Sequence, residues 1–192
     1  MAVESEYIVR KPIKISSLPK IRALACGEQH VVFLDSEGNV WSCGWNNDGQ
    51  LGLGNNLTIF LPERITTITQ PVTSVACGLL HSLFLDCDGS VWGCGANHQG
   101  QIGMLGRTSV NVPEIIQHIP PITSIVCGVS HSFFVEHNGT VWGAGSGAYL
   151  GSLPNKLQSL FAASNRKPKR IKNFRLAPPA IDEIPQKSAR NT

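Results

Sequence analysis

The chain has 192 residues, of which 42% are hydrophobic, so it is long enough and apolar enough to fold around a substantial core. It has no apolar run of about 18 residues and no basic, then apolar, amino terminus, which argues against a transmembrane helix and a secretory signal. We therefore expect an intracellular protein, cytoplasmic or nuclear, with no membrane contact. The net charge of +3 conceals an asymmetry, because residues 24–165 carry −6 whereas residues 1–23 and 166–192 carry +3 and +6.

One pattern occurs three times along the chain, with a spacing of 51 and then 50 residues. In each copy a Cys-Gly pair is followed by a histidine, an apolar stretch, a tryptophan and another glycine. The aligned residues are Cys26, Gly27, His30, Trp41 and Gly44; Cys77, Gly78, His81, Trp92 and Gly95; and Cys127, Gly128, His131, Trp142 and Gly145. Recurrence at a fixed period indicates a structural role for these residues.

A fifth aligned position is a proline, and it suggests the boundaries of the repeats: Pro12, Pro62, Pro113 and Pro168. We predict an amino-terminal extension over residues 1–11, followed by three tandem repeats within residues 12–175. The repeats cover about 12–61, 62–112 and 113–167, with a final basic strand at 168–175. Residues 176–192 lack an apolar period and are predicted to be a disordered tail.

Within each repeat the apolar residues alternate with the two-residue period of β strands. In the second repeat the predicted strands are 63–68, 72–78, 81–86 and 90–95. A helix-like pattern at 155–164 is interpreted as an insertion in the third repeat. Four antiparallel strands in a repeat of about 50 residues are typical of a propeller blade.

The loop that follows each tryptophan carries the most specific motif. Gly44–Gly52 reads Gly-Trp-Asn-Asn-Asp-Gly-Gln-Leu-Gly, and Gly95–Gly103 repeats its Gly-x-Asn-x-x-Gly-Gln-Ile-Gly form. The third copy has lost the Gly-Gln-Leu-Gly element and is two residues shorter between Gly145 and Gly151. Together with the Cys-Gly and histidine positions, this motif resembles the repeat of the regulator of chromosome condensation family over residues 12–175.

The resemblance implies an all-β fold, a β-propeller of four-stranded antiparallel blades. Because a ring of this family typically has seven blades, three repeats predict a partial, open propeller. Its apolar end faces would need cover, since an exposed inter-blade surface is unfavourable in water. Further blades, a second copy of the chain or another protein are the partners that we expect there.

The cysteines and histidines have structural interpretations as well as chemical ones. Five of the six cysteines recur at repeat positions without a metal-binding or redox spacing, so we expect buried, reduced thiols. The three aligned histidines lie one blade apart and do not converge, so each is expected to hold a turn by hydrogen bonding. Neither a phosphate-binding loop nor a dinucleotide fingerprint is present, and we expect no metal and no cofactor.

No nucleophile with an adjacent base and no paired carboxylates are visible, so a catalytic role is not expected. Two interpretations of function stay open. The first is a non-catalytic protein–protein interaction module, or scaffold. The second, implied by the resemblance, is a guanine-nucleotide exchange factor for a Ran-like small GTPase, with acidic loop residues such as Glu28 and Asp48 facing a basic surface.

A basic cluster near the end of the repeats is a separate candidate site. Its residues are Arg166, Lys167, Lys169, Arg170, Lys172 and Arg175. The cluster is either the solvated face of the last strand or a site for nuclear targeting and nucleic-acid phosphates.

Overall fold

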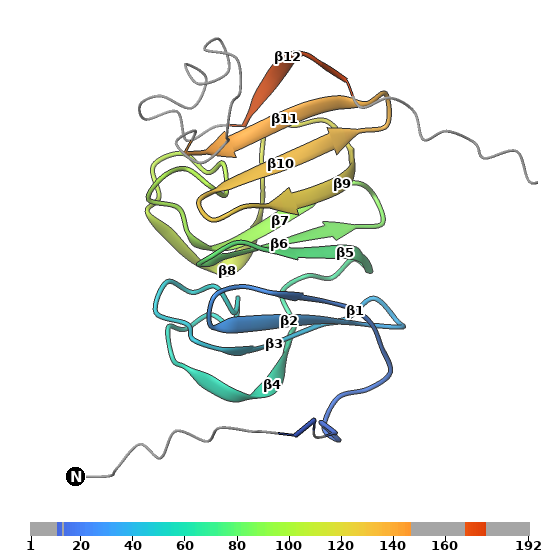
Figure 1. The fold of residues 1–192 in the computed structure, drawn as a ribbon, viewed down its shortest axis with the longest axis vertical. Helices are drawn as coiled ribbons and strands as arrows, with labels where there is room; N and C mark the ends of the chain where they lie inside the picture. The colour runs from blue at the N-terminus through green and yellow to red at the C-terminus, as the bar shows by residue number, and fades with distance from the viewer. Residues whose placement is uncertain (1–10, 13, 147–167, 176–192) are drawn as a thin grey trace, which may run out of the picture.

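The structure is a computed structural model, and it describes residues 11–12, 14–146 and 168–175. Every element in these ranges is a β strand, and the twelve strands form three four-stranded sheets whose paired strands are all antiparallel. The sheets stack in chain order along the long axis of the molecule and do not close into a ring (Figure 1). The predicted all-β, partial and open β-propeller of four-stranded blades is confirmed.

Each sheet contains four strands that are consecutive in the chain. The first sheet consists of β1 (Ile21–Cys26), β2 (His30–Asp35), β3 (Val40–Gly44) and β4 (Ile59–Ile65). The second consists of β5 (Val72–Cys77), β6 (His81–Asp86), β7 (Val91–Ala96) and β8 (Ser109–Ile115). The third consists of β9 (Ile122–Cys127), β10 (His131–Glu136), β11 (Thr140–Gly145) and β12 (Lys169–Arg175).

The sheets are offset from the proline-to-proline repeats of the sequence. The strand predicted at 63–68 lies at 59–65 and is the last strand of the first sheet, with Pro62 inside it. Proline is tolerated there because β4 is an edge strand, where a missing N–H leaves no ladder bond unmade. Each repeat therefore contributes its first strand to the preceding sheet. The helix-like pattern at 155–164 and the tail at 176–192 lie outside the described residues.

An acidic residue at the end of the second strand fixes the central hairpin of each sheet. In the second sheet, Asp86 accepts hydrogen bonds from the backbone N–H groups of Asp88 (3.0 Å) and Ser90 (2.8 Å). Its other oxygen accepts a bond of 2.9 Å from Trp92 Nε1. Gly89 provides the positive φ of +82° that the turn requires. Asp35 repeats the arrangement with Trp41, whereas Glu136 accepts from Trp142 Nε1 and Asn138 accepts from the N–H of Thr140 in the third sheet.

Apolar side chains from neighbouring sheets form two buried clusters. Between the first and second sheets, Val32 and Leu34 pack with Val72 and Phe84. Between the second and third sheets, Leu83, Ile102, Ile125 and Phe134 are among the residues of the second cluster. The core therefore lies between the sheets, so each sheet depends on its neighbours for the burial of its apolar faces.

A histidine also joins each sheet to the next one. His30 Nε2 lies 3.0 Å from Ser82 Oγ, and the Ser82 hydroxyl donates a bond of 2.8 Å to the carbonyl oxygen of Gln50. His81, Ser132 and Gln101 form the same relay between the second and third sheets, with distances of 2.9 and 2.7 Å. These rings thus link two blades, whereas the sequence suggested that each would hold a turn.

The relay determines the protonation of the histidines. Because the serine hydroxyl has one proton and gives it to the carbonyl, it must accept from Nε2–H of the histidine. The Nδ1 atoms of His30 and His81 are buried without a hydrogen-bond partner in the structure, as expected for neutral rings. Burial lowers the pKa of His30 to about 4, and burial together with the neighbouring His30 and His131 lowers that of His81 to about 3.

Stability should consequently fall in mildly acidic solution. A histidine of the unfolded chain binds a proton below about pH 6.5, whereas in the folded chain His30 stays neutral until about pH 4 and His81 until about pH 3. The stabilisation is present above pH 6.5 and is lost as the pH decreases towards 4. For His30 the shift corresponds to about 3 kcal/mol. Urea unfolding measured between pH 7.5 and pH 4 should show this loss.

The double variant H30Q/H81Q should have a much flatter pH profile than the wild-type chain. The matched control is H98Q, because His98 is an exposed histidine that takes no part in the relay. A double variant with the wild-type pH dependence would show that the relay does not govern it.

Replacing Asp86 should destabilise the second sheet. D86A removes the acceptor of three hydrogen bonds in a residue that is 3% exposed, so we expect a loss of about 3 kcal/mol in the free energy of unfolding. D88A, at an exposed position in the same turn, should change it by less than about 0.5 kcal/mol. Equal effects of the two variants in urea titrations would contradict this role for Asp86.

Candidate interaction surface

The short turns between the first two strands of the three sheets follow one another along one side of the molecule, on the left in Figure 1. Each turn closes by a bond from a glycine N–H to a histidine carbonyl, as from Gly78 to His81 (2.9 Å). A side chain at Gly78 would overlap the His81 ring, so this position requires glycine. Neighbouring turns are joined by backbone bonds of 3.2 Å, from Glu28 N–H to Leu79 O and from Leu79 N–H to Val129 O.

The longer loops after β3 and β7 lie on the same side of the molecule. The asparagine and the glutamine of the motif determine the shape of these loops. Asn46 accepts from the N–H of Leu51 (2.9 Å) and donates to the carbonyl of Asn55 (3.0 Å). Gln50 accepts from the N–H of Asp48 (3.0 Å). Asn97 and Gln101 make the equivalent bonds in the second blade. Both loops are therefore held by buried side chains and present fixed surfaces.

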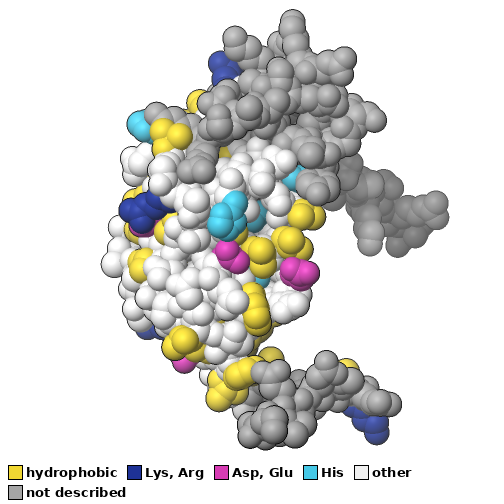
Figure 2. Space-filling view, turned by 90° about the vertical axis from the view of Figure 1, so that its left-hand side faces the viewer, with side chains coloured by type: hydrophobic (Ala, Val, Ile, Leu, Met, Phe, Trp, Pro, Cys, Tyr) yellow, Lys and Arg dark blue, Asp and Glu magenta, His cyan; other side chains and the backbone are white. Residues whose placement is uncertain are grey.

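The side chains on this side of the molecule form a surface that we call the loop face. Its residues are Glu28, Trp45, Asp48, Leu79, His98 and Val129. Trp45 is 39% exposed and Val129 is 45% exposed, and Trp45 is connected to the short turn by a bond to the carbonyl of Gln29 (2.8 Å). Asp48 and His98 lie 3.3 Å apart and join the two long loops. Figure 2 shows this side of the molecule, where hydrophobic side chains gather beside acidic side chains and histidine.

The loop face has the side chains of a protein-binding surface. Among the described residues, no group of three or more His, Cys, Asp or Glu side chains could hold a metal ion. The described part of the chain likewise has no helix able to cross a membrane. Exposed aromatic and aliphatic side chains beside carboxylates, on rigid loops, can bind another protein.

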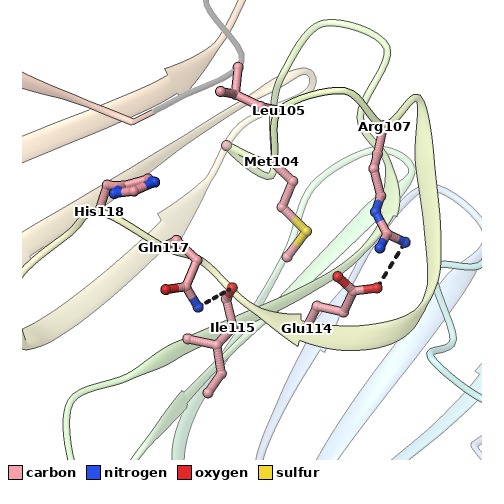
Figure 3. A pocket seen from close by; sticks show the side chains of 8 residues that line it. Met104, Leu105, Arg107, Glu114, Ile115, Gln117 and His118 are labelled. Carbon is pink, nitrogen blue, oxygen red and sulfur yellow. Dashed lines mark hydrogen bonds and ion pairs between the residues drawn. The ribbon is translucent and has the colours of Figure 1, made fainter.

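A pocket of about 210 Å³ on the outer side of the second sheet is a weaker candidate. Figure 3 shows Met104, Arg107, Glu114 and His118 among its lining side chains. Arg107 and Glu114 form an ion pair of 2.9 Å with each other, which leaves neither charge directed at a ligand. His118 has a φ of 68°, but its side chain is exposed at the rim.

The cysteines of the repeats lie between the sheets and at the open end. Cys94 is fully buried, whereas Cys26 and Cys87 are exposed. Burial raises the pKa of Cys77 to about 12 and also raises the pKa values of Cys94 and Cys127. All described cysteines are free thiols, and those three are poor nucleophiles at neutral pH because they remain protonated.

The other residues singled out in the sequence do not converge on one site. Trp41, Trp92 and Trp142 are half-buried and serve the hairpins described above. Gly44, Gly95 and Gly145 have positive φ values of 111°, 102° and 106°.

The basic cluster is only partly described. Lys169, Arg170, Lys172 and Arg175 lie in β12, which pairs with β11, and Arg170 is exposed. Arg166 and Lys167 lie outside the described residues, and a nucleic-acid contact stays a prediction.

Sequence reasoning missed two sets of residues. Ser82 and Ser132, which accept from the histidines, directly follow His81 and His131, so the His-Ser pair was an available signal. The apolar tips, half-buried Leu79 and exposed Val129, had no signal in a single sequence, because their placement depends on how the turns are aligned across blades.

Comparison with known proteins agrees with this geometry. Models of the Regulator of chromosome condensation (RCC1) repeat match residues 37–85 and 88–135, and a second model of the same description matches 21–50 and 72–101. The X-linked retinitis pigmentosa GTPase regulator homolog of Caenorhabditis elegans is 40% identical over 88 residues, which are 45% of this chain and 6% of that protein.

Two further relatives extend the comparison. The Protein RCC2 homolog of Xenopus laevis is 41% identical over 80 residues, which are 41% of this chain and 16% of that protein. The crystal structure of Prp20p from Saccharomyces cerevisiae, a protein described with its binding to Gsp1p and histones, superposes with a TM-score of 0.70 at 25% identity. That superposition covers 81% of this chain and 39% of Prp20p.

The chain thus spans well under half the length of each of these relatives. The repeat models cover half of it, and the three sheets have the fold that the relatives share. The chain belongs to the RCC1 repeat family.

Proposed function

We propose that the chain is a non-catalytic protein–protein interaction module that binds a partner through the loop face. The observation that carries this proposal is the row of short turns with exposed Val129, half-buried Leu79 and exposed Trp45 on a scaffold joined by backbone bonds from blade to blade. Solvent-exposed apolar side chains that are held in place cost stability unless they serve a contact. Aromatic side chains of this kind are frequent anchors of protein interfaces.

The partner's complementary surface should be apolar with a basic border. Glu28 and Asp48 provide the charges of the loop face, and Arg107, the basic residue of the described long loops, is paired with Glu114. Complementary charge would orient the partner and speed association, while the apolar contacts would supply most of the affinity.

Nucleotide exchange on a Ran-like small GTPase is the second candidate. It is supported by the acidic side chains Glu28 and Asp48, by the relative named a GTPase regulator and by the binding of Prp20p to Gsp1p. Exchange of this kind works through differential affinity, since contacts that favour the nucleotide-free GTPase release its ligand. The chain, however, corresponds to 39% of Prp20p, and its third repeat lacks the Gly-Gln-Leu-Gly element.

Substitution within the loop face should weaken partner binding. W45S/V129S removes two exposed apolar anchors, so binding of partners recovered from a cell extract should weaken at least tenfold, as measured by quantitative co-precipitation. The matched control is L105S, because Leu105 is an exposed aliphatic residue at the outer pocket. Equal losses in both variants, or none in the first, would refute the loop face as the binding site.

The two candidate functions differ in their effect on nucleotide release. The purified chain, mixed with a Ran-like GTPase that carries a fluorescent guanine nucleotide, should leave the release rate unchanged. A stimulated rate that falls with D48K would establish exchange and remove the purely non-catalytic interpretation. Intact Prp20p with Gsp1p, the protein that it is described as binding, serves as the control reaction for the same assay.

A further inference from the structure

Each contact between neighbouring sheets has two different faces, which we name after the bond from histidine to serine. The donor face carries the histidine, and the acceptor face carries the serine. The donor face carries the histidine and the glutamine loop, as in the first sheet with His30 and Gln50. The acceptor face of the next sheet carries Ser82, which bonds to both. It also carries Asn111, whose side chain donates to Asn56 Oδ1 (3.0 Å) and whose carbonyl accepts from Gly54 N–H (2.9 Å).

Packing completes this acceptor face. A Cβ at Gly52 would lie only 2.8 Å from Pro113 Cγ, so the glycine loop of the first blade lies directly on the proline of the second. The same relation holds between Gly103 and Pro168. The positions that form an acceptor face can therefore be identified in all three sheets from the register of the repeats.

The acceptor face of the first sheet is uncovered within the described part of the chain. Leu24, Phe60 and Leu61 lie at acceptor positions and are 58%, 89% and 71% exposed. In the third sheet, Ile125 occupies the position of Leu24 and is 6% exposed. All twelve described strands are already used in the three sheets, so the described residues supply no fourth sheet to cover this face.

This open face also differs chemically from the two covered acceptor faces. Val31 stands where the other sheets have Ser82 and Ser132, directly after the histidine. Phe60 stands where the second sheet has Asn111. The positions of Ser82 and Asn111, whose side chains make hydrogen bonds in the contact between the first and second sheets, are thus apolar here.

A second copy of this chain fits the open face poorly. The donor face of the third sheet carries His131, whose buried Nδ1 has no hydrogen-bond partner within the described part of the chain. A head-to-tail copy would place His131 against Val31, which cannot accept a hydrogen bond from Nε2. Burying a ring N–H without an acceptor is unfavourable, so the pair opposes self-association.

We propose that the open acceptor face of the first sheet seats a β-sheet of a different polypeptide, one that presents an aliphatic side chain where the donor faces of this chain present histidine. Val31 is then the residue that determines which sheet can dock. The face is separate from the loop face, so failure of either proposal leaves the other standing.

The experiment uses the chain itself as the source of donor faces. Two labelled probes carry V31K, which blocks their own acceptor face with a charge, and one of them also carries H131L. Each probe is titrated onto immobilised wild-type chain and onto immobilised V31S. The H131L probe should bind the wild-type chain at least tenfold more tightly than the probe that keeps the histidine, and this preference should reverse on V31S.

Light scattering provides an independent readout without labels. The wild-type chain should remain monomeric, whereas H131L alone and V31S alone should each associate, because each removes the mismatch. Thermal melting checks that every variant is folded, and L24K replaces V31K as the block if V31K unfolds the chain. Equal binding of the two probes, no binding by any pair, or association of the wild-type chain that L24K abolishes would overturn the proposal.

Discussion

The hydrogen bond from a buried histidine to the serine of the next blade is the interaction on which this molecule depends. It fixes the distance between sheets, since ring, hydroxyl and carbonyl must all be in register at 2.7–3.0 Å. It also requires a neutral ring, which desolvation ensures. The apolar clusters supply most of the burial energy, but they are tolerant of small shifts in a way that this relay is not.

The relay in turn positions the loop face. The histidine carbonyls accept from the glycine N–H groups of the short turns, and the glutamine carbonyls accept from the serines while the glutamine side chains hold the long loops. Scaffold and surface are therefore built from the same few residues. A chain with this organisation can vary the tips, such as Glu28, Leu79 and Val129, without altering the contacts beneath them.

Much of the fold could be predicted because its signals are local and recur. The Cys-Gly, histidine, tryptophan and glycine positions identified the blade. The offset between repeat and sheet could not be found in the same way, since Pro62 looks like a boundary and lies inside an edge strand. Glu28 and Asp48 of the loop face were expected from the sequence, but the position of Leu79 beside Glu28 was not, because the hydrogen bond that joins these two turns links residues about one repeat apart.

Donor and acceptor faces on opposite sides give the array a direction, with consequences for how such chains can change. A whole repeat can be gained or lost and every remaining junction still joins a histidine face to a serine face. A deletion of half a repeat would instead bring two faces together that share no complementary groups. The single position after the histidine, where Val31 departs from Ser82 and Ser132, shows how one side chain can change the chemistry of one face in a series of similar sheets.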